Sequence, residues 1–104
     1  PWTDEAIAVM LHKKNVVMDI SGWRPRYIPD QLKREMTRRL QDKILFGSDY
    51  PGWSPGQCLD ELAMDGIKDR VAEKIFHGNA IRVLKLANKI ARAEKAQQSR
   101  AKSA

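Results

Sequence analysis

Asp49 is the residue of this sequence best placed to carry out chemistry. It lies near the end of residues 44–51, ILFGSDYP, where an apolar run gives way to a carboxylate, an aromatic ring and a proline. This order predicts a short buried strand with one acid at its carboxyl end, and Pro51 prevents the strand from continuing. Because (β/α) barrels place their chemistry at the carboxyl ends of the strands, Asp49 is a candidate catalytic residue.

Strands and helices alternate along the part of the chain that positions Asp49. The apolar runs 16–20 and 44–47 predict two buried strands. Helices are predicted from Thr3 to about Asn15, from Asp30 to Leu40, from Ser54 to Gly66, over 68–76, and from Asn79 onward. Strands that alternate with helices of this length predict parallel βα units and an α/β fold.

Local signals predict where several of these helices begin and end. Thr3 is predicted to cap the first helix, and Ser54 with Gln57 matches a capping box in front of the third. Gly78 is predicted to stop a helix, and Asn79 to cap the next one. Leu32, Met36 and Leu40 are four residues apart and predict one apolar face.

Composition and charge restrict the classes of protein. The chain has 104 residues, 42% of them hydrophobic and 31% charged, which indicates a globular protein rather than a disordered one. A single cysteine, Cys58, predicts a small buried side chain on a helix and fits a cytoplasmic location. No apolar stretch approaches the roughly 20 residues of a membrane span.

The net charge of +6 belongs to the C-terminal residues. Residues 1–81 carry 12 basic and 12 acidic side chains, whereas residues 82–104 carry seven basic side chains and Glu94. No aromatic residue follows Phe76, so this end offers no stacking platform for single-stranded nucleic acid. We therefore expect nucleic acid to be an unlikely partner. The alternative is a small basic binding module that contacts nucleic acid or an acidic partner through this tail.

Three segments, in order, resemble the amidohydrolase-related family that includes aminocarboxymuconate-semialdehyde decarboxylase and the resorcylate decarboxylases. Residues 1–23, from PWTDEA to NVVMDISGW, resemble the helix after strand six followed by strand seven. Residues 45–51, LFGSDYP, are similar to strand eight, and residues 78–84, GNAIRVL, to the closing helix. The resemblance implies the C-terminal portion of a (β/α)8 TIM barrel over 1–86, with a basic helical or disordered tail over 87–104.

The same resemblance implies a role for Asp49 and a limit on what the chain does alone. In the family, the aspartate at this point binds a divalent metal ion, zinc in our expectation, and handles the protons of the reaction. The other ligands are histidines of earlier strands, and neither His12 nor His77 matches their motif. A lone aspartate makes a weak site, so we expect this chain alone to bind no metal stably and to catalyse nothing measurable.

The loop after each strand supplies candidates for substrate binding in a complete barrel. Arg24 is either a clamp for a substrate carboxylate or an ordinary surface arginine. Trp23 is either a pocket wall or a packing residue, and Tyr50 either lines the pocket or covers the end of the strand. Asp19, within the first strand, is a candidate buried acid that supports the barrel by hydrogen bonding.

The function implied is that of a metal-dependent hydrolase or non-oxidative decarboxylase of a small carboxylated substrate. A complete barrel takes about 250 residues and eight strands, and this chain supplies two strands. The remaining strand edges and apolar helix faces need cover. We therefore expect self-association or a complementing chain, and no membrane partner.

Overall fold

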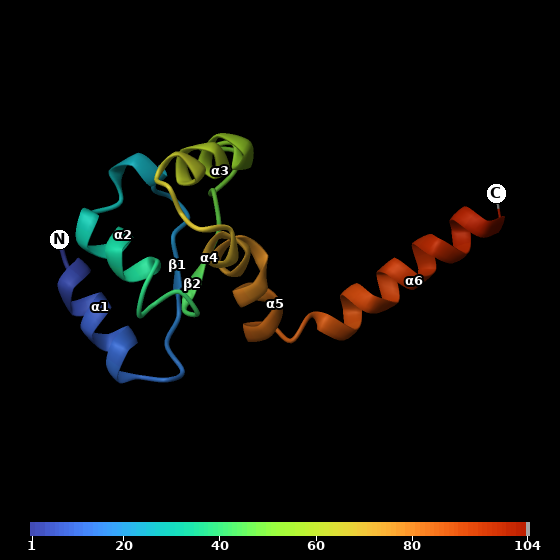
Figure 1. Cartoon of the computed structure of the whole chain (residues 1–104), viewed down its shortest axis with the longest axis horizontal. Coiled ribbons are helices and arrows are strands. Elements are labelled where there is room, and N and C mark those ends of the chain that lie inside the picture. Colours follow the sequence, from blue (N-terminus) through green and yellow to red (C-terminus); the bar gives the residue numbers. More distant parts are fainter. Residues whose placement is uncertain (104) are drawn as a thin grey trace.

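The structure, a computed structural model, describes residues 1–103. It is a helix-dominated α/β chain with two strands (Figure 1). Its elements in chain order are α1 (Thr3–His12), β1 (Met18–Asp19), the 3-10 helix η1 (Pro25–Tyr27), α2 (Asp30–Met36), β2 (Ile44–Leu45), α3 (Pro55–Met64), α4 (Asp69–Glu73), the π-helical turn η2 (Lys74–Gly78), α5 (Asn79–Val83) and α6 (Ala87–Ser103).

The two strands form a parallel pair, as the alternation of strands and helices predicted. Met18 is paired with Ile44 and Asp19 with Leu45. Two further hydrogen bonds extend the contact, from Met18 N to Lys43 O at 2.9 Å and from Ile20 N to Leu45 O at 3.1 Å. The strands are shorter than the predicted 16–20 and 44–47. They have only each other as neighbours within the described residues, so regular pairing is limited to this overlap.

The core lies where the helices meet the strand pair. Ile7 and Met10 face inward from α1, Leu32 and Met36 from α2, Leu62 from α3 and Ile75 from η2. Ile44 on β2 is fully buried among them. Figure 1 shows α1 and α2 on one side of the strands and α4 and α5 on the other.

The apolar face predicted for the second helix is confirmed, but the helix is shorter than predicted. It ends at Met36, where the backbone of Thr37 turns (ψ 0°) and its hydroxyl donates to Arg34 O at 3.1 Å. Leu40 is nevertheless fully buried, because a hydrogen bond of 2.8 Å from its amide to Glu35 O holds the next turn against the core.

The predicted helix stop at Gly78 and the predicted cap at Asn79 are wrong. Both residues have helical backbone angles, and α4, η2 and α5 run on without a break. Asn79 is fully buried, and its side-chain amide donates to Gln41 O and to Ile44 O, each at 2.8 Å. The amide nitrogen satisfies backbone carbonyls near β2, and the side-chain oxygen, the atom that would cap a helix, instead accepts from Arg82 Nη1 at 3.3 Å.

The other predicted caps also differ from the structure. Ser54 does precede α3, and Pro55 is its first residue, but the Ser54 side chain makes no capping hydrogen bond. The residue that precedes α1 is Trp2 rather than Thr3. The same helix ends at His12, short of Asn15. At the start of α1 and at the start of α3, the first turn forms without the capping hydrogen bond from a side chain that the sequence pattern indicated.

The last helix leaves the body of the chain. Lys85, between α5 and α6, has a left-handed backbone (φ 54°), which redirects the chain. No residue of α6 is buried, and Figure 1 shows it extending away from the other elements. Within residues 1–103, no helix is both long and apolar enough to cross a membrane.

Candidate functional site

Asp49 lies in a tight turn after β2, separated from the end of the strand by residues 46–48. Its backbone is left-handed (φ 62°), a conformation that aspartate adopts more readily than most residues. Its carbonyl accepts a hydrogen bond of 2.9 Å from Gly52 N. The side chain is exposed, and Oδ2 would lie 3.8 Å from a Cβ at Gly22. The acid after β2 therefore lies beside the loop that follows β1.

Asp19 marks the matching end of β1. Its Oδ1 accepts a hydrogen bond of 2.7 Å from Ser21 N, which shapes the start of the loop. A Cβ at Gly47 would lie 2.8 Å from both Asp19 Oδ1 and Ser21 Cβ, so a larger residue there would require these side chains to shift. Asp19 is hydrogen-bonded as predicted, and its burial within a complete barrel stays a prediction. With no strand on its outer side within residues 1–103, it stays exposed.

Arg24 is held by two partners on α3 and the loop before it. Its guanidinium donates to Glu61 Oε1 and lies over the Trp53 ring, 5.4 Å from the centroid. Arg26 also donates to Glu61 Oε1, at 3.0 Å from Nη2 and 3.2 Å from Nε. The arrangement joins η1 to α3 and fixes one face of the Arg24 guanidinium.

Glu61 is the member of this cluster that sequence reasoning missed. Its side chain is 13% exposed, and it receives hydrogen bonds from both arginines. Desolvation opposes ionisation of Glu61, but the hydrogen bonds from Arg26 and Arg24 outweigh it, so the pKa of this carboxyl is lowered from 4.5. One acid on α3, far along the chain from both arginines, gives no spacing signal that could have identified it.

Cys58, one turn before Glu61, is buried on α3 as predicted. Burial is the main cause that raises the pKa of its thiol. A thiol held in its neutral form is a poor nucleophile and a poor metal ligand, so Cys58 is a packing residue.

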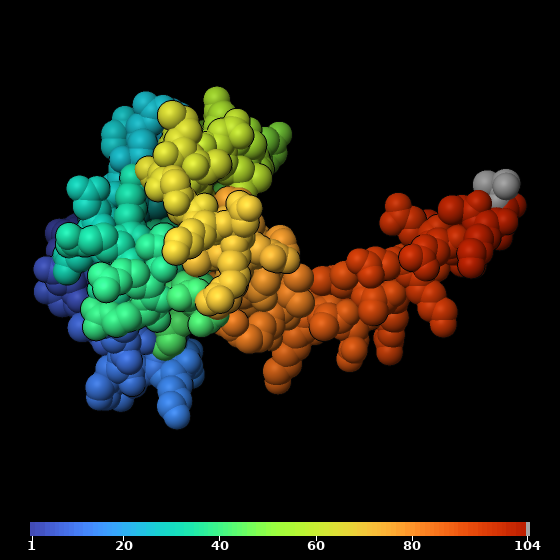
Figure 2. All heavy atoms as spheres, in the orientation of Figure 1, coloured from blue at the N-terminus to red at the C-terminus, as the bar shows by residue number. Residues whose placement is uncertain are grey.

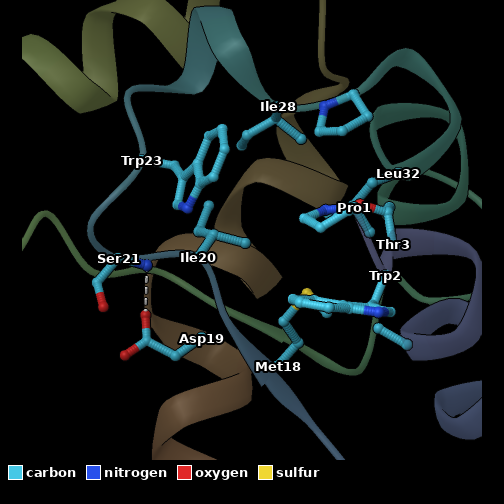
Figure 3. Close-up of a pocket in the computed structure, with 12 residues that line it drawn as sticks. Pro1, Trp2, Thr3, Met18, Asp19, Ile20, Ser21, Trp23, Ile28 and Leu32 are labelled. Atoms are coloured by element: carbon cyan, nitrogen blue, oxygen red, sulfur yellow. Dashed lines mark hydrogen bonds between the residues drawn. The ribbon is translucent and has the colours of Figure 1, made fainter.

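A cavity of about 420 Å³ lies beside β1, between α1 and α2. Figure 3 shows Trp2, Met18, Ile20 and Trp23 around it. The lining is Pro1, Trp2, Thr3, Ala6, Met18, Asp19, Ile20, Ser21, Trp23, Ile28, Pro29 and Leu32. The structure thus brings Trp23 to this cavity, whereas Arg24, Asp49 and Tyr50 are not among its walls. Tyr50 is 75% exposed.

The described residues do not form a complete metal site. Across residues 1–103, no three histidine, cysteine, aspartate or glutamate side chains lie close enough together to hold an ion. His12 on α1 and His77 on η2 are both exposed and belong to separate elements. Asp49 therefore offers one possible ligand, whereas a catalytic metal needs about three protein ligands and an open position.

The sequence of the chain matches a known protein family. A family model described as Amidohydrolase matches residues 1–86, which takes in both strands, both strand-end loops and every helix before α6. No curated protein and no solved structure matches the chain. Divalent metal ions are used in general in this superfamily. The match covers most of the chain and includes Asp49 in its turn after β2, so the chain belongs to the amidohydrolase family.

Proposed function

We propose that this chain contributes Asp49 to the active site of a metal-dependent hydrolase or non-oxidative decarboxylase that acts on a small carboxylated substrate. The observation that carries the proposal is the exposed carboxylate of Asp49 at the carboxyl end of a parallel strand, inside the segment that matches the family. A carboxylate at this position is suited to accept or donate a proton at a reacting carbon or water.

The metal site requires a second polypeptide segment. Asp49 is one oxygen ligand, and within residues 1–103 it belongs to no group of three histidine, cysteine, aspartate or glutamate side chains that could hold an ion. A divalent ion such as zinc, held by several ligands, lowers the pKa of bound water toward about 7. The remaining ligands therefore have to come from outside residues 1–103, and the chain alone is proposed to be inactive.

The outer side of β1 supports this requirement for a neighbour. In a parallel pair, alternate residues hydrogen-bond to opposite sides, so the amides of Val17 and Asp19 face away from β2. The cavity beside β1 is lined mainly by apolar side chains, among them the 75% exposed Trp2 and the 61% exposed Trp23. We propose that a strand of a complementing chain pairs here, as strand six of a (β/α)8 barrel whose strands seven and eight are β1 and β2.

The loop residues have distinct proposed roles toward the substrate. Arg24 is held against Glu61 and Trp53, which leaves part of its five-donor guanidinium free for a substrate carboxylate. Holding the guanidinium in place lowers the entropy lost when a carboxylate binds. Trp23 and Tyr50, which expose large aromatic surfaces, are proposed as walls of the substrate pocket in the complete enzyme.

The test mixes the chain with a polypeptide that carries strands one to six of an amidohydrolase barrel. Native mass spectrometry then measures zinc bound per complex for the original chain, for Asp49→Asn and for Asp19→Asn. We expect one zinc ion per complex with the original chain. Asp49→Asn is expected to weaken zinc binding more than about 100-fold, because even outer-shell changes cost about 10- to 100-fold.

Asp19→Asn is the matched control, because Asp19 is an exposed acid at the end of the neighbouring strand and Asn can keep the bond from Ser21 N. It is expected to leave zinc affinity within about threefold of the original. Equal zinc binding by the Asp49→Asn complex would overturn the proposed role of Asp49. Failure of the chain to join the barrel polypeptide would overturn the proposed complementation.

A further inference from the structure

Helix α6 forms an arm that no other element covers. It runs for 17 residues, about 25 Å at 1.5 Å per residue, and none of them is buried. Figure 2 shows it projecting from the rest of the molecule. The family match ends at residue 86, immediately before this helix. The arm is therefore a surface separate from the proposed metal chemistry.

The charges of the arm are collected on one face. Five basic residues, which we call the basic face, are Lys89, Arg92, Lys95, Arg100 and Lys102. At 3.6 residues per turn they lie within an arc of about 160°. The opposite arc carries Ile90, Glu94, two glutamines and four alanines. This segregation is not required for a helix that is solvated on all sides.

The positive charge of the arm is not neutralised within the described residues. We call residues 1–86 the body. Every ion pair found across residues 1–103 involves a cation of the body, such as Arg24, Lys33 or Arg82, and none involves the basic face. Residues 87–103 carry five basic side chains and one acid, Glu94, which gives a net charge of +4. A row of unpaired cations on a rod favours a partner with regularly spaced negative charges.

We propose that the basic face binds the phosphate backbone of double-stranded nucleic acid without reading its sequence. A duplex carries about one negative charge per 1.7 Å of its axis, so phosphates are available along the whole arm. Nucleic acid was expected to be an unlikely partner because the C-terminal residues have no aromatic ring on which unpaired bases would stack, but a duplex needs no such ring. The arm changes this expectation, because its charge lies on an exposed surface outside the body.

The composition of the arm distinguishes a duplex from other anionic partners. Ile90 is the one large apolar residue in 87–103, which is too little to embed a helix in a lipid surface or to form a coiled-coil seam. The arm has no aromatic residue on which unpaired bases would stack, so single strands gain nothing over a duplex.

Binding is expected to stabilise the helix as well. An unpacked helix of this length is marginal in water, and like charges on one face oppose it further. Phosphates that neutralise the basic face remove this repulsion. Helicity measured by circular dichroism should therefore rise when duplex is added.

The test measures binding of the full chain to a fluorescein-labelled DNA duplex of about 20 base pairs by anisotropy, over a range of salt concentrations. We expect affinity to fall as salt rises, with a log–log slope between about −2 and −4.5, the upper value being five phosphate contacts at about 0.9 each. Reversal of three arm charges, Lys89→Glu with Arg92→Glu and Lys95→Glu, should weaken binding at least about tenfold and reduce the slope by about 2 to 3.

The matched control reverses three exposed charges of the body, Lys14→Glu with Lys68→Glu and Arg70→Glu. It changes the net charge equally, and it is expected to weaken binding less than about threefold. Equal losses in the two triple variants would mean a response to net charge alone and would overturn the proposal. Stronger arm-dependent binding to anionic phospholipid vesicles than to the duplex, or no duplex binding at low salt, would overturn it as well.

Discussion

The rest of the chain covers the outer edge of β2 and leaves the outer edge of β1 without a strand partner within residues 1–103. On the outer side of β2, Phe46 N donates to Ile75 O at 3.1 Å, and Ile44 O accepts from the Asn79 side chain at 2.8 Å. On the outer side of β1, no strand of residues 1–103 pairs with the backbone, and a cavity of about 420 Å³ lies alongside. One edge is covered by a helix, and the other is open to a neighbour.

The π-helical turn η2 explains how β2 is covered. In a regular α-helix, Asn79 N would bond to Ile75 O. In η2 it bonds instead to Lys74 O, which frees Ile75 O for Phe46. A neighbour on this side has to pair beyond Phe46 or displace η2, whereas β1 is accessible as it stands. If the chain forms part of the proposed barrel, assembly is therefore expected to begin at β1.

The largest expected effect is that of Asn79→Ala. It removes two hydrogen bonds of a fully buried side chain and leaves Ile44 O and Gln41 O without this donor. We expect the free energy of unfolding to fall by about 3 kcal/mol, because each buried group left unsatisfied costs about 1–3 kcal/mol. Urea denaturation followed by circular dichroism measures the change.

Asn88→Ala is the control for Asn79→Ala, because Asn88 is an exposed asparagine on α6. Its effect should stay within about 0.5 kcal/mol. Similar effects of the two substitutions would mean that Asn79 does not hold η2 against β2, and the difference between the edges would then lose its physical basis.

A smaller effect is expected for Gly47→Ala, which acts at the end of β1. The new Cβ would lie 2.8 Å from Asp19 Oδ1 and 2.8 Å from Ser21 Cβ, so the loop after β1 has to shift. We expect a loss of about 1–3 kcal/mol in the free energy of unfolding, as for other overpacked sites. Gly56→Ala is the control, since its Cβ would lie 3.7 Å from Ser54 Oγ in ordinary contact. A loss for Gly47→Ala no greater than for the control would show that the two strand ends are not in close contact.

The smallest effect is a pH dependence from Glu61, which accepts hydrogen bonds from Arg24 and Arg26. The pKa of Glu61 is lowered from 4.5 in the folded chain, so its stabilisation is present above pH 4.5 and is lost as pH falls through the folded value. The urea midpoint of the original chain should exceed that of Glu61→Gln near neutral pH. The two urea midpoints should converge as the pH falls through the folded value of this pKa.

Glu35→Gln is the comparison for Glu61→Gln, because a hydrogen bond from Arg39 also lowers the pKa of Glu35, on α2 away from the two arginines. It should show the same direction of pH dependence without loosening η1 from α3. A constant gap between the original chain and Glu61→Gln at every pH would mean that the charge of Glu61 does not hold the arginines.

The sequence predicted the parallel strand pair and the position of an acid after β2, because both follow from local patterns of apolar residues and strand breakers. It predicted the apolar face that ends in Leu40 for the same reason. The role of Asn79 was missed, because a Gly-Asn pair normally marks the end of a helix. In the structure the helix continues through both residues, and the Asn79 side chain bonds to Ile44 O of β2. Glu61 was missed because its partners are 35 and 37 residues away along the chain.

Hydrogen exchange of individual amides, measured by NMR, tests the central claim most directly. In the chain alone, Phe46 N, which is bonded to Ile75 O, should exchange slowly, and the amides of Val17 and Asp19 should exchange quickly. Addition of the polypeptide with strands one to six should slow the amides of Val17 and Asp19, because a strand then pairs with β1. Slow exchange at Val17 and Asp19 in the monomeric chain alone would contradict an open β1 edge and, with it, the account of an incomplete barrel.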